Sequence, residues 1–103
     1  MKRPSLEPRQ REARLLMLAR QLMRDEISEG QLLRALRRDV LGLSQDDYAR
    51  LVGVSRRTLS DLERGQGNAT IELLDRVFRP LGLRVGLIPR DPELLGQLIN
   101  PAD

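Results

Sequence analysis

Apolar residues recur every three or four positions through most of the chain, which is the period of amphipathic helices. The first predicted helix covers residues 9–26, and its apolar stripe is wide enough to bury much of one side. Ser28 is a candidate N-cap for a second helix that runs to about Val40, with Gln31 placed to complete a capping box. Gly42 suits the end of that helix, because glycine readily adopts the left-handed backbone conformation.

Three further helices are predicted before residue 82. Ser44, Ser55 and Thr70 each precede an apolar-periodic stretch and can cap it with a side-chain oxygen. The helices that begin after Ser44 and Ser55 are short and end at glycine-containing turns. Pro80 should bend or end the helix that begins after Thr70. That helix is expected to bury Ile71, Leu74, Val77, Phe78 and Leu81.

The pattern changes at the C-terminal end of the chain. Leu83, Val85 and Leu87 alternate with other residues, as in a short strand, and Pro89 ends the alternation. Residues 91–99 are predicted to form a short final helix. The fold class is therefore mainly α, with one short strand.

The composition removes several kinds of chemistry. The chain has neither cysteine nor histidine, so it lacks disulfides, the usual zinc ligands and the base of a Ser-His-Asp triad. Its carboxylates form no obvious acid–base pair in the sequence. We therefore expect no enzyme activity, no metal and no cofactor.

Charge is mild overall but unevenly placed. The net charge is +3, from 18 basic and 15 acidic residues, and the first 24 residues carry seven basic and two acidic side chains. A basic arm is typical of nucleic-acid binding, but it is equally a device for solubility.

No apolar run is long enough to span a membrane or to serve as a signal peptide. We therefore expect a cytoplasmic protein that does not associate with a membrane.

The segment from Gln45 to Glu63 carries the strongest functional signal. Two helices that cross over a short turn need a small residue where their backbones approach, and Ala49 supplies it. The turn itself needs a residue that tolerates positive φ, which Gly53 does. Apolar side chains at the intervening positions can join the two helices to each other and to the core: Tyr48, Val52, Val54, Leu59 and Leu62.

These positions resemble the Xre/Cro repressor family of helix-turn-helix regulators over about residues 31–88. The resemblance is carried by Leu43-Ser44-Gln45, Ala49, Gly53-Val54-Ser55, Leu59-Ser60 and Glu63-Arg64-Gly65. It implies a five-helix Cro/repressor-like DNA-binding domain, to which this chain adds an N-terminal helix. Tyr48 departs from the family, which usually has leucine there, and we expect its hydroxyl to reach the surface.

The second motif helix presents the residues expected to read DNA. Its exposed N-terminal positions are Arg56, Arg57, Ser60 and Asp61, and a recognition helix reads base edges from that end. Asp61 either accepts a hydrogen bond from cytosine or orients a neighbouring arginine, and we favour the second role. By resemblance, Gln45 would meet the DNA at the N-terminus of the first motif helix, where free N–H groups favour a phosphate. The resemblance also implies phosphate contacts by Ser55, Thr58, Arg64 and Asn68.

The family also implies an ion pair that braces the recognition helix. Glu63 matches the acidic position, and Arg38 matches the arginine on the preceding helix, with Arg37 as the alternative.

The predicted strand has no second strand in the chain, so we expect it to pair with its own copy in a homodimer. Leu83, Val85 and Leu87 would lie at that interface, an arrangement that resembles the HipB-like antitoxin branch of the family. The predicted organisation is an N-terminal arm and helix at 1–27, a helix-turn-helix DNA-binding domain at 28–82, and a dimerisation strand and tail at 83–103.

Several functions fit this sequence. The leading one is a regulator of transcription that binds double-stranded DNA, at an inverted-repeat operator, as a homodimer. The alternative is an antitoxin that also binds a cognate toxin protein, and a third interpretation is a protein-interaction module that does not bind DNA. The N-terminal helix could extend the dimer interface, add to the core or bind another protein. Its Arg14, Arg20 and Arg24 could reach DNA, although a solvated basic face is favoured.

Overall fold

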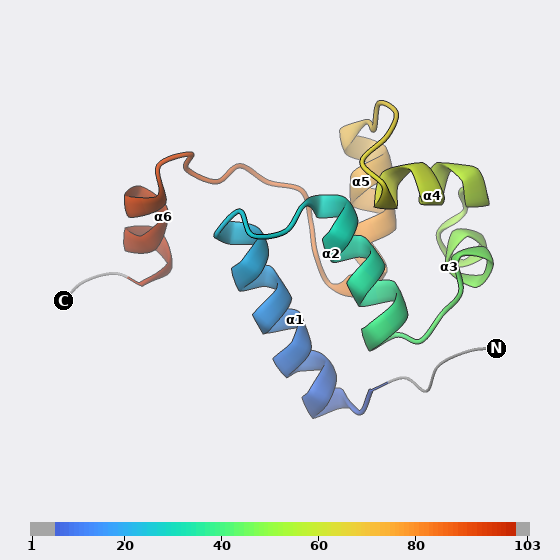
Figure 1. Cartoon of the computed structure of the whole chain (residues 1–103), viewed down its shortest axis with the longest axis horizontal. Coiled ribbons are helices and arrows are strands. Elements are labelled where there is room, and N and C mark those ends of the chain that lie inside the picture. Colours follow the sequence, from blue (N-terminus) through green and yellow to red (C-terminus); the bar gives the residue numbers. More distant parts are fainter. Residues whose placement is uncertain (1–5, 101–103) are drawn as a thin grey trace.

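Helices make up the regular secondary structure of residues 6–100, the part of the chain that the computed structural model describes (Figure 1). The order is α1 (Pro8–Met23), α2 (Glu29–Ala35), a π-helical turn η1 (Leu36–Val40), α3 (Gln45–Val52), α4 (Arg56–Glu63), α5 (Ile71–Phe78), a 3₁₀ turn η2 (Arg79–Leu81) and α6 (Pro92–Ile99). The mainly helical class and the final helix predicted from the sequence are confirmed.

The helix starts follow from local side-chain hydrogen bonds. Ser28, Ser44, Ser55 and Thr70 each accept a hydrogen bond from a backbone N–H in the first turn of the helix that follows. Gln31 returns a bond to the backbone of Ser28, which completes the predicted capping box. These four predicted N-caps are therefore confirmed.

The core lies where α2 and η1 meet α1, α3, α4 and α5. Leu32, Leu33 and Leu36 are almost fully buried, and α1 adds Leu18 to the same cluster. The apolar stripe predicted for α5 is buried at Val77, Phe78 and Leu81 and partly buried at Leu74. The prediction is wrong for Ile71, whose side chain is 71 % exposed. It lies at the exposed start of α5, between Thr70 and Glu72, which are exposed as well.

The second predicted helix does reach Val40, but its last turn is wider than an α-helix. The backbone N–H of Leu41 donates to the carbonyl oxygen of Leu36 at 3.0 Å, five residues back. Gly42 follows with a φ of +67°, which ends the helix as predicted. A π turn changes the face on which neighbouring side chains lie, and such turns are frequent at functional sites.

Tyr48 is fully buried, so the expectation that its hydroxyl reaches the surface is wrong. The hydroxyl instead donates a hydrogen bond to the carbonyl oxygen of Val77, in the last turn of α5. Carbonyl groups in a last helical turn lack the regular partner four residues on, so the phenol satisfies a polar group that burial would otherwise leave unpaired. Burial raises the pKa of Tyr48 to about 12.

Residues 83–89 form no strand within the described part of the chain. The backbone N–H of Leu83 donates to Phe78, and the segment then runs without regular structure to α6, leaving Val85 and Leu87 exposed. One chain offers this segment no neighbouring strand, so the predicted strand is absent from it. Figure 1 shows α6 set apart from the helical body at the end of this segment, and Leu95 is the buried residue of that helix.

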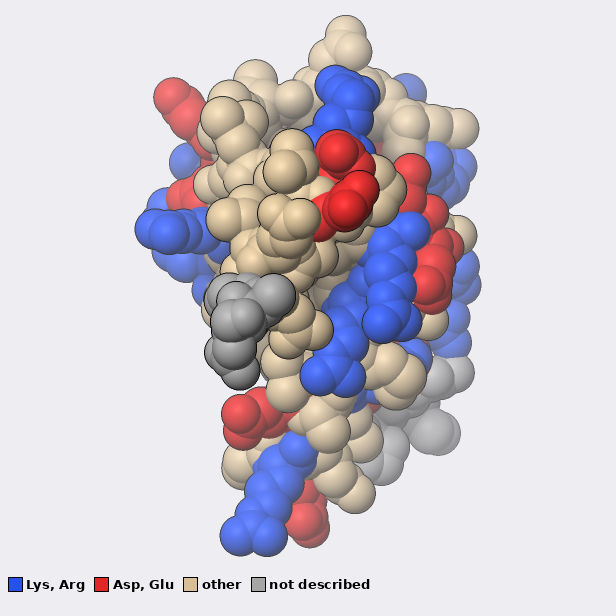
Figure 2. Space-filling view, turned by 90° about the vertical axis from the view of Figure 1, so that its left-hand side faces the viewer, with Lys and Arg blue, Asp and Glu red and all other residues tan. Residues whose placement is uncertain are grey.

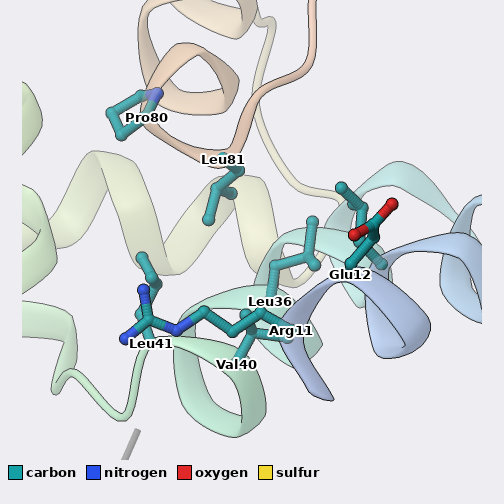
Figure 3. A pocket seen from close by; sticks show the side chains of 8 residues that line it. Arg11, Glu12, Leu36, Val40, Leu41, Pro80 and Leu81 are labelled. Atoms are coloured by element: carbon teal, nitrogen blue, oxygen red, sulfur yellow. The ribbon is translucent and has the colours of Figure 1, made fainter. Parts of the chain in front are cut away.

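A shallow pocket lies between α1, η1 and η2 (Figure 3). Most of its lining is aliphatic, from Leu36, Val40 and Leu81, and its charged groups, Arg11 and Glu12, both come from α1. Arg11 uses its Nε to donate to the carbonyl oxygen of Leu6, 2.7 Å away. The pocket is therefore a gap in the packing of α1 on the body, with no convergent polar groups at its base.

Among residues 6–100, no helix combines the length and apolarity needed to cross a membrane.

Candidate nucleic-acid interface

Helices α3 and α4 form a helix-turn-helix unit. Figure 1 shows α4 lying across the end of α3, with a short turn between them. Gly53 in that turn has a φ of +76°, and the N–H of Val54 donates to the carbonyl oxygen of Ala49 at 3.0 Å. Ala49 is buried where the two helices approach. Ala49 as the small residue at the crossing, and Gly53 as the residue with positive φ in the turn, therefore have the roles that the sequence predicted.

Gly30 sets the distance between α2 and α4. A Cβ at Gly30 would lie 2.5 Å from the carbonyl oxygen of Leu62 and 2.6 Å from that of Glu63. Only glycine therefore lets the first turn of α2 pack against the last turn of α4. The sequence pattern did not predict this role. The available signal was a glycine at the second position of a helix, where its low helix propensity brings no local advantage.

A buried ion pair braces the C-terminal end of α4. The Nε and Nη2 atoms of Arg37 donate to the two carboxylate oxygens of Glu63 at 2.6 and 2.9 Å, and Nη1 donates to the carbonyl oxygen of Leu43 at 2.8 Å. The side chains of Arg37 and Glu63 are only 6 % and 3 % exposed. This geometry satisfies the bidentate preference of an arginine–carboxylate pair.

The predicted pairing of Glu63 with Arg38 is wrong, and the alternative, Arg37, is correct. Arg38 is only partly buried and has no ion pair in the range 6–100. The reason is the helix face on which each arginine lies. Gly30, which packs against the end of α4, comes seven residues before Arg37, and about two turns of helix therefore place Arg37, rather than its neighbour, on the side toward α4.

Gln45, predicted to contact DNA, is joined to this ion pair. It is the first residue of α3, and its Nε2 atom donates to Oε1 of Glu63 at 3.0 Å. One carboxylate oxygen thus receives hydrogen bonds from both Arg37 and Gln45. The sequence did not predict this link between the two motif helices.

Two arginines project from the start of α4. The side chains of Arg56 and Arg57 are exposed, as the sequence predicts for the N-terminal end of a recognition helix. Arg56 lies 3.6 Å from the carboxylate of Asp46 on α3, an ion pair in which both partners are largely exposed. Arg57 has no ion pair or side-chain hydrogen bond within the described residues, so its guanidinium is available to a ligand.

The remaining residues predicted to contact DNA differ in whether their side chains already form hydrogen bonds to neighbouring residues. Ser55 caps α4 and also donates its hydroxyl to Oγ1 of Thr58 at 2.9 Å. Asp61 accepts a hydrogen bond from Nη2 of Arg64 at 3.0 Å, one turn further along α4. Ser60 is partly exposed on α4, and Asn68 is exposed in the loop before α5.

A helical body with a braced two-helix unit of this geometry defines a helix-turn-helix domain. The family model described as helix-turn-helix matches residues 33–88, more than half of the chain. The chain therefore belongs to the helix-turn-helix family, which confirms the resemblance carried by the sequence motifs.

Two relatives agree with this assignment. An uncharacterized HTH-type transcriptional regulator of Haemophilus influenzae is 32% identical over 71 residues, covering 63% of this chain and 72% of the relative. Another of that description, from Methanothermobacter thermautotrophicus, is 42% identical over 45 residues, covering 44% of this chain and 65% of the relative. No solved structure matches the chain.

Proposed function

We propose that this chain is a transcriptional regulator that binds double-stranded DNA at a specific sequence. The observation that carries the proposal is the pair of exposed arginines, Arg56 and Arg57, at the start of a helix that a buried ion pair holds in place. Guanidinium groups at that end of a recognition helix are suited to the N7 and O6 acceptors of guanine in the major groove. The two relatives named as HTH-type transcriptional regulators support the same function.

The other residues of the proposed interface have distinct roles. Ser60 lies on α4 one turn after the two arginines and is placed with them for base contacts. The hydrogen bond between Asp61 and Arg64 supports the interpretation that Asp61 orients an arginine. Contacts to phosphate groups, which set the register of the protein on the duplex, are assigned to Gln45, Ser55, Thr58, Arg64 and Asn68.

The DNA-bound form is proposed to be a homodimer joined through residues 83–88. Val85 is 40 % and Leu87 103 % exposed, and the backbone of 84–89 makes no hydrogen bond within the described chain. Antiparallel pairing with the same segment of a second chain would satisfy those backbone groups and cover Leu83, Val85 and Leu87. Two recognition helices related by a two-fold axis call for an inverted-repeat operator, with half-site centres about 34 Å apart.

Selection of bound duplexes from a random pool tests this proposal directly. We expect an enriched sequence with two-fold symmetry, bound tightly at physiological salt, and a dimer mass by light scattering at micromolar concentration. Failure to enrich any sequence would contradict specific DNA binding. An enriched site without two-fold symmetry would contradict the dimer while leaving DNA binding intact.

A second candidate function is an antitoxin that also binds a protein toxin. The observation that favours it is a group of exposed apolar side chains on α6, the helix on the side of the molecule that Figure 2 turns toward the viewer. Leu94, Leu98 and Ile99 on α6 are each more than half exposed, as is Leu16 on α1. The test is co-expression with the product of the adjacent reading frame: a toxic product neutralised in a stoichiometric complex supports this function, and a harmless product contradicts it.

A further inference from the structure

The amide of Gln45 is held in one orientation by the buried ion pair beneath it. A glutamine amide has a donor end and an acceptor end, whereas an ionised carboxylate can only accept. Because Oε1 of Glu63 lies 3.0 Å from Gln45, the nitrogen end of the amide must face inward. The carbonyl oxygen and the second N–H of Gln45 are then directed elsewhere.

The carboxylate of Glu63 is itself fixed on the other side. Arg37 donates to both of its oxygens, and the third guanidinium nitrogen is anchored on the backbone of Leu43, just before α3. Both side chains of the ion pair are nearly inaccessible to solvent, so screening does little to loosen them. The chain of contacts runs without a gap from η1 through the end of α4 to the first residue of α3.

We propose that Arg37 and Glu63 are positioning residues for a DNA contact made by Gln45, in addition to their role in bracing α4. This inference rests on the proposed function, because it takes Gln45 to contact the duplex. Arg37 neutralises Glu63, so the carboxylate can hold the amide without placing an uncompensated negative charge below the DNA. The second N–H of Gln45 is thereby presented to a phosphate oxygen with little freedom left to lose on binding.

A double-mutant cycle on DNA affinity separates positioning from bracing. Glu63→Gln keeps the shape of the side chain but lets either end of the Gln45 amide face inward. It should weaken operator binding roughly fivefold, the factor expected for about one hydrogen bond, and Gln45→Ala should have a similar effect. In the Gln45→Ala background, Glu63→Gln should add less than about a twofold change. An equal loss in both backgrounds would overturn the inference, because bracing of α4 does not depend on Gln45.

Two controls keep this cycle interpretable. Leu18→Ala on α1 lowers stability in the core away from the two motif helices, and it should leave affinity unchanged when binding is measured well below the melting temperature. Since Gln45 is uncharged, its loss should not alter the dependence of affinity on salt, unlike the loss of an arginine. A changed salt dependence would show that Gln45→Ala disturbs a charged contact and would overturn the inference.

A second measurement uses the unmodified protein, in case Glu63→Gln prevents folding. By NMR, the side-chain amide protons of Gln45 should exchange slowly with water and show restricted motion. Gln66, exposed in the loop after α4, provides the reference for a free amide. Identical behaviour of the two amides would overturn the inference. A wild-type chain that binds no duplex would instead overturn the proposed function, whatever the NMR measurement shows.

Discussion

Tyr48 on α3 and Val77 on α5 are joined by a hydrogen bond from the phenol to the backbone carbonyl, 2.5 Å long and fully buried. A leucine, which the family usually has at this position, could fill the space but could not satisfy that carbonyl group. The bond ties the first helix of the DNA-binding motif to the helix that closes the core. Tyr48 is also the single tyrosine of a chain without tryptophan, so its ultraviolet absorbance reports on this one contact.

The ionisation of Tyr48 should make stability fall at high pH. Its pKa is about 12 in the folded chain and 10.0 in its ordinary state. Below pH 10 the phenol is protonated in both the folded and the unfolded chain, and the free energy of unfolding is at its full value. Between pH 10 and about 12 the unfolded chain loses this proton while the folded chain keeps it. The free energy of unfolding should therefore fall as the pH rises, by about 2–3 kcal/mol in all. Tyr48→Phe should remove this dependence and cost about 1 kcal/mol at neutral pH. A phenolate titration of the native protein centred near pH 10 would contradict the prediction.

Gly30→Ala should destabilise the fold although alanine is the better helix former. The new methyl group would overlap two backbone carbonyl oxygens of α4, and we expect a loss of about 1–3 kcal/mol in urea unfolding. Gly96→Ala is the matched control, because a Cβ at Gly96 in α6 meets no atom within 4 Å. That variant should be neutral or slightly stabilising. Equal effects of the two substitutions would show that the close approach of α2 and α4 is not what selects glycine.

Adjacent arginines should differ sharply in their contribution to stability. Arg37→Ala leaves the buried carboxylate of Glu63 without its main partner and should cost about 3–5 kcal/mol. Arg38→Ala, next to it in the sequence, should cost less than about 1 kcal/mol. Thermal unfolding of the two single variants, and of each combined with Glu63→Ala, measures the coupling energy. Coupling of Glu63 to Arg38 instead of Arg37 would refute the observed pairing.

Arg56→Ala and Arg57→Ala should weaken specific DNA binding without affecting folding. Each lost bidentate contact to a base should cost about 1–3 kcal/mol of binding free energy. Arg20→Ala, an exposed arginine of α1, is the charge-matched control and should change affinity little. Fluorescence anisotropy on the selected operator and on an unrelated duplex makes the comparison. If both α4 variants bind the operator like the wild type, α4 is not the recognition helix.

Val85→Pro should prevent the proposed dimer. Proline removes a backbone donor that a strand ladder needs, so we expect monomers or aggregates by light scattering. Specific affinity should collapse, while weak, salt-sensitive binding persists because the individual arginines remain. Val85→Thr keeps the donor and the branched side chain and should remain dimeric. Wild-type monomers at micromolar concentration would rule out this mode of assembly.

The parts of the fold that the sequence predicts well are those decided by neighbouring residues. Ser28, Ser44 and Ser55 cap the helices after them because the acceptor and the donor lie within three residues of each other. The role of Gly53 is equally local, since its positive φ is a property of the turn itself.

The errors arise where distant segments decide the outcome. The choice of Arg37 over Arg38 depends on the position of α4, which lies against the helix face that also carries Gly30. Ile71 fits the apolar stripe of its helix, yet no other element among residues 6–100 covers the start of α5. The hydrogen bonds from Tyr48 to Val77 and from Gln45 to Glu63 join residues that are 29 and 18 positions apart in the sequence. Patterns within a few neighbouring residues therefore cannot predict them.

The detached position of α6 gives the molecule two parts that differ in how closely they are packed. Substitutions in α2, α3 and α4 act on one tightly packed core, where a single methyl group matters, as at Gly30. In the segment from Val85 to Ile99, Leu95 is the buried residue, and it lines a second pocket with Leu22 and Met23 of α1. Most of the other side chains of this segment are exposed. Segments with few buried contacts open most readily, so hydrogen exchange should reach the backbone amides of this tail long before those of α2, α3 and α4.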